Sequence, residues 1–336
     1  MKPFKLPLAL TFIAMAAAFA LGGVKDVVLV AVLCILEISL SLDNAVANAA
    51  VLRHWSEKWR DRFMTWGLPV AIFGMRLVFP LLIVAIAGHI GFFEAGKMAL
   101  EAPRQYAQIL TSAHHEVSAF GGAFLLMVFF KFMLDRDKDE HWISIVERPL
   151  ARLGRLTAIE VALTLAVIAI VSTRLPDIER ASFLVAGLGG VIAFVVSHGI
   201  GDFVGGDEAG NRVVRESVAG FLYLEMLDSS FSFDGVIGAF ALTNNVFLIA
   251  IGLGVGASYI RQMTLILLKK GTLAQYRFLE HGAFWAIGAL AVIMLSVNVD
   301  VPEVITGLIG AFTIGAAVIS SIVVQRREAV AGDRAS

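Results

Sequence analysis

Long apolar runs, separated by short polar or charged segments, extend over nearly the whole chain. A helix that crosses a bilayer needs about 20 mostly apolar residues. Ten stretches fit this pattern, at 6–23, 27–52, 66–88, 113–134, 156–171, 182–200, 218–242, 246–268, 281–297 and 304–323. The pattern predicts an all-α, polytopic membrane helix bundle of about ten spans.

Composition supports the same class of protein. Hydrophobic residues make up 58% of the chain and charged residues 16%, which is more apolar surface than a water-soluble domain of 336 residues can cover. The formal net charge of −1 and the lack of a basic tract give no indication of nucleic-acid binding. The single cysteine, Cys34, can form no intrachain disulfide.

Basic residues are distributed unevenly between the loops. With the N-terminus in the cytoplasm, cytoplasmic segments carry 20 of the 27 Lys and Arg residues, opposite loops carry five, and two lie within spans. This asymmetry predicts a multi-pass protein of the inner (plasma) membrane with both termini in the cytoplasm. The first run also resembles a signal peptide, with Lys2 and Lys5 before an apolar stretch ending Ala18-Phe19-Ala20. An uncleaved span and a cleaved signal both remain open.

Two acidic motifs stand inside apolar runs. Residues 37–43 read Glu-Ile-Ser-Leu-Ser-Leu-Asp and residues 228–234 read Asp-Ser-Ser-Phe-Ser-Phe-Asp. In both halves the next span carries an arginine, and the span after that opens with a His/Glu pair. The matching spans are five apart, and an odd offset reverses the second copy in the bilayer. The order predicts an inverted repeat of three-helix units, as in secondary transporters.

The repeat divides the chain into five parts. They are an N-terminal span or signal-like segment (1–26), repeat 1 (27–134), a cytoplasmic loop with two connecting spans (135–216), repeat 2 with the final span (217–324) and a cytoplasmic tail (325–336). The charged loop 135–155 is expected to be a solvated connection. The glycine-rich runs 187–190 and 252–256 are expected to be faces of close helix packing rather than nucleotide loops.

The motif acids require a chemical explanation. Each ionised carboxylate at the bilayer centre costs about 2.5–3.5 kcal/mol on insertion scales. Protons, arginine partners or a bound cation must therefore neutralise them. Carboxylate, amide and hydroxyl oxygens suit hard divalent ions such as Mn²⁺, Mg²⁺ and Ca²⁺.

These considerations give three groups of candidate residues. The predicted metal ligands are Glu37, Asp43, Asn44, Asp228 and Asp234. The supporting residues are Ser41, Ser232, Asn48 and Ser230. Coupling or gating is assigned to Arg76, Arg261, His115, Glu116, Glu280 and His281, for which structural or interfacial roles are the alternative.

Helical spacing separates two polar faces in the first motif. Glu37, Ser41, Asn44 and Asn48 fall on one stripe of a regular helix. Asp43 lies off that stripe by about a third of a turn. Either the helix has a broad polar face, or it breaks near the Ser/Asp segment and frees backbone carbonyls to coordinate an ion.

Segments 37–47 and 231–239 resemble the TerC family of integral membrane proteins, named for tellurite resistance. The resemblance covers the repeat units, about half of the chain. The second segment departs from the family pattern at Gly235 and Gly238, so the chain resembles a divergent branch. The resemblance implies a role in metal-ion homeostasis, including manganese export.

The sequence thus predicts a secondary transporter, not an enzyme, that exports a divalent cation, with Mn²⁺ favoured. The ion is the substrate, and no cofactor is expected. Moving a divalent cation out of an interior-negative cell costs about 4.6 kcal/mol per 100 mV, which favours exchange for protons. The expected partners are the metal ion, protons and the lipid bilayer, with the oligomeric state open. The alternative is a membrane scaffold or metal-loading partner in which the acids form a structural ion-pair core. An intramembrane enzyme with paired aspartates is disfavoured, because the acids belong to matched repeats.

Overall fold

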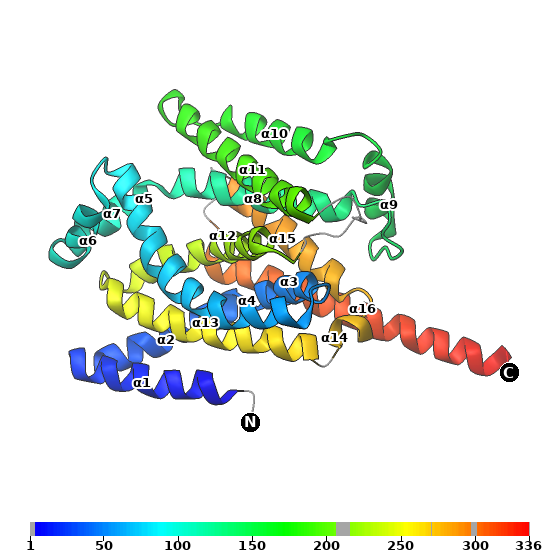
Figure 1. The fold of residues 1–336 in the computed structure, drawn as a ribbon, viewed down its shortest axis with the longest axis horizontal. Helices are drawn as coiled ribbons and strands as arrows, with labels where there is room; N and C mark the ends of the chain where they lie inside the picture. Colours follow the sequence, from blue (N-terminus) through cyan, green and yellow to red (C-terminus); the bar gives the residue numbers. More distant parts are fainter. Residues whose placement is uncertain (1–3, 206–215, 270, 297–300, 336) are drawn as a thin grey trace.

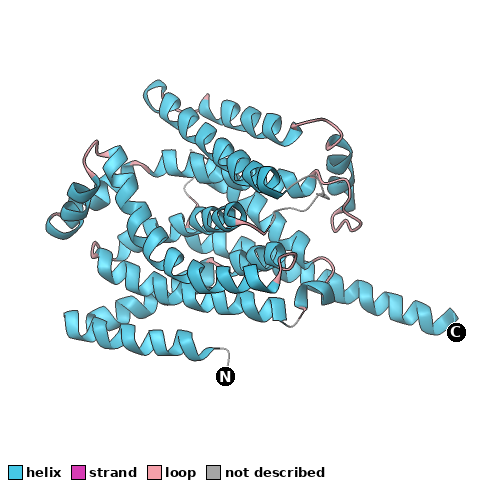
Figure 2. Cartoon of the chain, in the orientation of Figure 1, coloured by secondary structure: helices cyan, strands magenta, loops and turns pink. Residues whose placement is uncertain are grey.

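The computed structural model describes residues 4–205, 216–269, 271–296 and 301–335. Regular structure in these ranges is entirely helical, with no strand among them (Figure 2). The predicted all-α class is confirmed.

Helices follow one another along the chain with short connections. The first half contains α1 (Lys5–Gly22), α2 (Val24–Leu40), α3 (Leu42–Leu52), α4 (Glu57–Pro69), the π-helix η2 (Val70–Val78), α5 (Phe79–Ala87), α6 (Phe92–Glu101), α7 (Pro103–Ser112) and α8 (His114–Met133). The second half contains α9 (Ser144–Leu153), α10 (Ile159–Ser172), α11 (Asp177–Gly205), α12 (Val218–Leu242), α13 (Val246–Lys269), α14 (Thr272–Gln275), α15 (Leu279–Leu295) and α16 (Glu303–Ala335).

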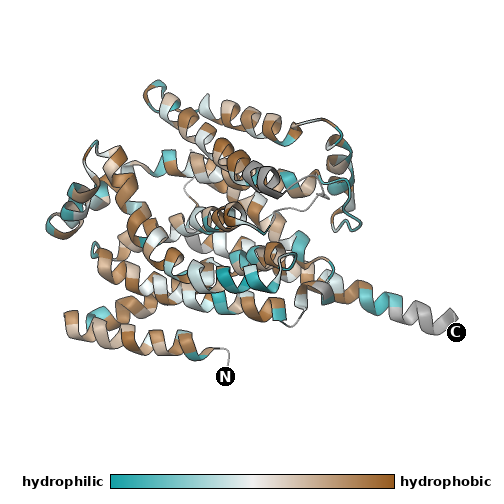
Figure 3. Ribbon diagram, in the orientation of Figure 1, coloured by the Kyte–Doolittle hydropathy of each residue, from teal (hydrophilic) through white to brown (hydrophobic). Residues whose placement is uncertain are grey.

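Six described helices or helix runs are long and apolar enough to cross a membrane. They are Lys5–Gly22, Glu57–Ala87, His114–Met133, Asp177–His198, Val246–Lys269 and Ile305–Glu328. Large apolar side chains on the outside, such as Phe12 (74% exposed) and Phe312 (75% exposed), would be unfavourable in water. Hydrophobic residues cover most helices, and hydrophilic residues gather on α6, α7 and α9 near opposite ends of the molecule (Figure 3). These features indicate a membrane-spanning protein.

Helix α12 lies in the middle of the bundle, between α8 and α11 on one side and α3 and α13 on the other (Figure 1). Helix α13 packs along α2, and α15 packs against α8 and α16. A Cβ on Gly256 of α13 would lie 2.5 Å from the Cβ of Glu37, and one on Gly252 would lie 2.6 Å from the Cβ of Leu33. The glycines therefore allow α13 to approach α2 closely, and the packing prediction for 252–256 is confirmed.

The first repeat contains two helical irregularities. The helix of the first motif breaks at Ser41, between α2 and α3, although the Ser41 carbonyl still accepts from the Ala45 amide at 3.3 Å. The next span changes to the π-helix η2 between Pro69 and Pro80. Pro80 has no N–H to donate to the carbonyl of Arg76, four residues earlier. The regular α-helical hydrogen bonding is therefore interrupted in η2. In contrast, α12 and α13 are continuous α-helices.

The prediction that loop 135–155 is only a solvated connection is wrong. Residues 144–153 form α9, and the Glu147 side chain is fully buried. Its carboxylate accepts from the backbone amides of Trp142 and Ile143 and from the Trp285 indole N–H on α15. A buried carboxylate must find such donors, and these attach the loop to the helix bundle.

Candidate functional site: an interior cavity with three carboxylates

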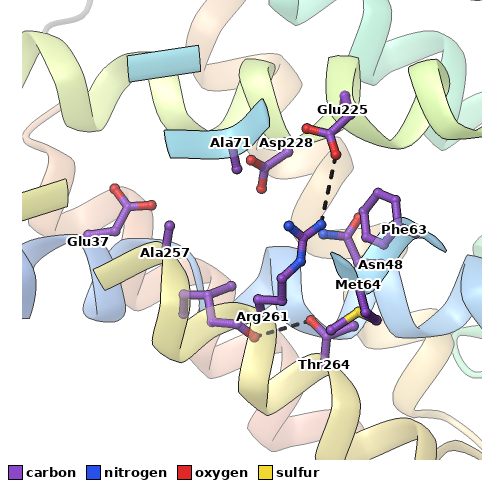
Figure 4. A pocket seen from close by; sticks show the side chains of 11 residues that line it. Glu37, Asn48, Phe63, Met64, Ala71, Glu225, Asp228, Ala257, Arg261 and Thr264 are labelled. Atoms are coloured by element: carbon purple, nitrogen blue, oxygen red, sulfur yellow. Dashed lines mark hydrogen bonds and ion pairs between the residues drawn. The ribbon is translucent and has the colours of Figure 1, made fainter. Parts of the chain in front are cut away.

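A small cavity lies among α2, α3, α4, η2, α12 and α13, with about 400 Å³ of empty space including its opening (Figure 4). Its polar lining consists of Glu37, Asn48, Glu225, Asp228, Arg261 and Thr264. Apolar side chains complete the wall: Phe63, Met64, Ala71, Ala257 and Ile260. The carboxylates of Glu225 and Asp228 project from α12 towards Arg261 on α13, and Glu37 approaches from α2 (Figure 4).

Glu37 and Arg76 form a tight, buried ion pair. Arg76 Nη2 donates to Glu37 Oε1, and the side chains are only 1% and 3% exposed. Ser41 Oγ donates to the same carboxylate oxygen at 3.1 Å. Arg76 Nη1 donates to the carbonyl of Ala71 at 2.5 Å, within the wide turns of η2. Each charge therefore has an opposite charge and a further hydrogen bond beside it, and only Arg76 Nε is left without a partner.

A chain of amide side chains connects the two acidic motifs. Asn48 Nδ2 donates to Asn44 Oδ1 at 3.0 Å, and Asn44 Nδ2 donates to Asp228 Oδ1. This chain runs from α3 to α12, between residues far apart in the sequence. Asp228 Oδ2 and Asn48 Oδ1 have no hydrogen-bond partner. The stripe inferred from helical spacing thus reaches the second motif through Asn44.

Glu225 is a cavity residue that the repeat pattern missed. It is 2% exposed, and neither of its carboxylate oxygens has a hydrogen-bond partner. It forms an ion pair with Arg261, whose Nη2 is 3.8 Å from Oε1. The matching place in the first motif, three residues before Glu37, holds Cys34. The available signal was its i, i+3 spacing from Asp228 on one helix face.

The remaining predicted ligands and supporting residues lie in different places. Asp43 is buried outside the cavity lining, where a Cβ on Gly310 of α16 would lie 2.7 Å from Asp43 Oδ2. Ser230 Oγ donates to the carbonyl of Met226, and Ser232 Oγ is buried without a hydrogen-bond partner. Asp234 belongs to α12, but its side chain lies outside the described part of the structure.

The two predicted His/Glu pairs occupy unlike surroundings. His115 Nδ1 lies 3.0 Å from Glu179 Oε2, and Glu116 Oε1 accepts from Ser182, so this pair connects α8 to α11 in a partly exposed position. His281 is buried, with Nδ1 2.9 Å from Glu147 Oε2, and Glu280 forms an ion pair with Arg53.

The Glu147 cluster at the loop differs from the cavity in that its charge is fully compensated. Burial alone raises the pKa of Glu147, but the hydrogen bonds with His281 and Trp285 and the charges of His281 and Lys138 outweigh it, so the pKa lies below its usual range. Burial lowers the pKa of Lys138, whose Nζ is 3.3 Å from Glu147 Oε2. This arrangement stabilises the contact between the loop and the helix bundle.

No group of three or more His, Cys, Asp or Glu side chains in the described part of the chain is arranged to hold a metal ion. In the cavity, Arg261 points from α13 towards Glu225 on α12 (Figure 4). Three carboxylates, Glu37, Glu225 and Asp228, face two guanidinium groups, Arg76 and Arg261. When all are ionised, the arrangement retains one uncompensated negative charge.

Fold and site together define an all-helical protein with membrane-length helices around a charged interior cavity. Residues 42–328 match a protein family described as "Protein of unknown function (DUF475)", and the chain belongs to that family. No curated protein and no solved structure matches the chain.

Proposed function

We propose that this protein is a secondary transporter of a divalent cation, and that the cavity is its transport site. The observation that carries the proposal is the Asp228 carboxylate, which is partly buried in the cavity wall. One of its oxygens is buried without a hydrogen-bond partner. The three carboxylates of the cavity have two arginines near them, Arg261 in the lining and Arg76 paired with Glu37. An uncompensated charge in a low-dielectric interior is costly, so a cation or proton must bind there for part of the cycle.

The donor atoms and the resemblance to the TerC family favour Mn²⁺. The oxygens of Asp228, Glu225 and Asn48 are hard donors, which suit Mn²⁺, Mg²⁺ and Ca²⁺ better than zinc or copper. Export of a divalent ion against an interior-negative potential favours exchange for protons, which the same carboxylates can carry.

An inverted-repeat bundle of ten spans in the inner membrane, with both termini in the cytoplasm, is part of the proposal. Helix runs occupy all ten predicted span positions. The packing is reciprocal between the two halves, which supports the repeat. The motif helix of each repeat packs on the second helix of the other: α2 packs on α13, and α12 packs on η2. Each motif helix also packs on the third helix of the other repeat: α3 packs on α15, and α12 packs on α8. In this arrangement the cavity lies where the two halves meet, as in repeat-built transporters.

The test is ion uptake into proteoliposomes under an imposed pH gradient, with Mn²⁺, Ca²⁺, Zn²⁺ and Mg²⁺ offered separately. The wild-type protein should move Mn²⁺ coupled to an opposite proton flux. Asp228→Asn keeps the shape and the hydrogen bond with Asn44 but removes the charge, so it should lose transport. Transport by Asp228→Asn at the wild-type rate would contradict the assignment of the cavity.

The second candidate is a membrane scaffold or metal-loading partner with a structural ion-pair core. The Glu37–Arg76 and Glu225–Arg261 pairs favour it, because each places an arginine against a buried carboxylate. A scaffold should tolerate Asp228→Asn and should leave cellular manganese unchanged when the gene is deleted. Equal manganese levels in deletion, wild-type and Asp228→Asn cells would favour the scaffold.

A further inference from the structure

Arg261 lies in the cavity without the close contacts that fix Arg76. It is the only positively charged residue of the described cavity lining. Its Nη2 is 3.8 Å from Glu225 Oε1, and its Nη1 has no hydrogen-bond partner. The guanidinium carbon lies 4.6 Å from the centre of the Phe63 ring. The guanidinium group is thus held by a ring face and a long ion pair, without bidentate hydrogen bonds. It can move away from Glu225 with little loss of specific contacts.

The atoms around Arg261 form an unsatisfied oxygen set. Both carboxylate oxygens of Glu225, Oδ2 of Asp228 and Oδ1 of Asn48 lack hydrogen-bond partners. All three side chains line the same cavity, and Glu225 is 2% exposed (Figure 4). Leaving buried acceptors unpaired is costly, and carboxylate and amide oxygens are the ligands of hard cations. The set is therefore satisfied by a cation smaller than a guanidinium group.

Charge indicates the class of that cation. Because Arg76 is paired with Glu37, the ionised carboxylates of Glu225 and Asp228 leave two negative charges in the cavity. Arg261 balances one of these charges, whereas a divalent cation balances both. The two cations repel one another and compete for the same oxygens.

We infer that Arg261 is a tethered counter-ion that occupies the cation site and that the transported divalent cation displaces. The returning guanidinium then assists release of the ion, so the site alternates between two positively charged occupants. This inference rests on the proposed function.

The test is equilibrium binding of Mn²⁺ to the purified full-length chain, without any gradient. Arg261→Gln removes the competing charge and should bind Mn²⁺ about tenfold or more tightly than the wild type. Arg261→Lys keeps a competing charge and should remain near the wild type. Arg277→Gln is the matched control for loss of one positive charge, because Arg277 pairs with Glu140 and Glu328 rather than lining the cavity.

Two further variants keep the inference testable if Arg261→Gln does not fold. Phe63→Leu removes the ring that supports the guanidinium and should tighten Mn²⁺ binding by a smaller factor. The double variant Glu225→Gln/Arg261→Gln should lose the tight binding, because a ligand is gone. Unchanged or weaker binding by Arg261→Gln and Phe63→Leu, with Mn²⁺ transport by the wild type, would overturn the counter-ion role and leave the proposed function standing. Absence of both binding and transport in every protein would remove both.

Discussion

The two arginine–carboxylate pairs of the interior are built differently. Glu37 and Arg76 meet in direct contact, Ser41 donates to the same carboxylate, and the Ala71 carbonyl accepts from Arg76, which leaves only Arg76 Nε without a partner. Glu225 and Arg261 are separated by 3.8 Å and leave several polar atoms unsatisfied. The tight pair lies between a broken helix and a π-helix, whereas the loose pair joins two continuous helices. The comparison supports the proposal that the first pair fixes the architecture and that the second exchanges partners.

Arg76→Ala should have the largest effect on stability. It leaves Glu37 buried without its counter-charge, at a cost of about 3–5 kcal/mol. Arg261→Ala also removes a counter-charge but should cost less, because the 3.8 Å separation from Glu225 is too long for a hydrogen bond. Thermal and chemical denaturation of the two purified variants in one detergent measures the difference. Equal losses of stability would mean that the two pairs do not differ in role.

Gly256→Ala tests the close approach that positions Glu37. The added methyl group would lie 2.5 Å from the Cβ of Glu37 and 2.9 Å from the Cys34 carbonyl oxygen. Helices α2 and α13 must separate, which should cost about 1–3 kcal/mol. Gly315→Ala is the matched control, because its new Cβ meets nothing within 4 Å. If both variants have the stability of the wild type, the close packing does not determine the position of Glu37.

Asn44→Ala should have a smaller effect, because it removes one connection between the motifs. It deletes the hydrogen bond to Asp228 Oδ1 and the acceptor for Asn48. A hydrogen bond to a charged group contributes about 1.5–3 kcal/mol, so a loss near the lower end is expected where the cavity admits water. The melting temperature measures the loss, and Mn²⁺ binding should weaken with it. A variant unchanged in both would show that the amide chain is dispensable.

The smallest expected effect is the pH response of the loop that contains Glu147. Folding lowers the pKa of Glu147. Its contribution to the stability of the fold is therefore complete above pH 4.5, its ordinary pKa, and is lost as the pH falls towards the pKa in the folded state. Burial and then Lys138 lower the pKa of His141, so protonation below its ordinary 6.5 weakens the contact in the same direction.

Hydrogen exchange at the amides of Trp142 and Ile143, which donate to Glu147, reports the opening of this loop. After correction for intrinsic rates, their protection should be constant above about pH 6.5 and decrease towards pH 4.5. Glu147→Gln should lose protection at every pH. Constant protection of the wild type down to pH 4 would contradict the assigned contacts.

Much of this arrangement could be predicted from sequence, for reasons visible in particular residues. Charged residues within apolar runs stand out, which identified Glu37, Arg76, Asp228 and Arg261. Glu225 is not part of the repeated motif, because Cys34 occupies the matching position in the first copy. Its partners lie on other helices, and sequence spacing does not specify which helices meet.

Asp43 and Glu147 illustrate the same limit. Helical spacing separated Asp43 from the stripe of Glu37, but only the packing of α16 reveals that Gly310 lies beside it. Glu147 lies in a charged loop, where nothing in the sequence distinguishes it from its solvated neighbours. Its burial depends on His281 and Trp285, more than 130 residues later.

The most direct test of the central claim is calorimetric titration of Mn²⁺ into the purified wild type and Asp228→Asn, in buffers with different ionisation enthalpies. If Mn²⁺ replaces the protons that otherwise neutralise the cavity carboxylates, the wild type should bind Mn²⁺ with release of protons, and Asp228→Asn should not bind. Equal binding by both proteins, or no binding by a folded wild type, would contradict the account.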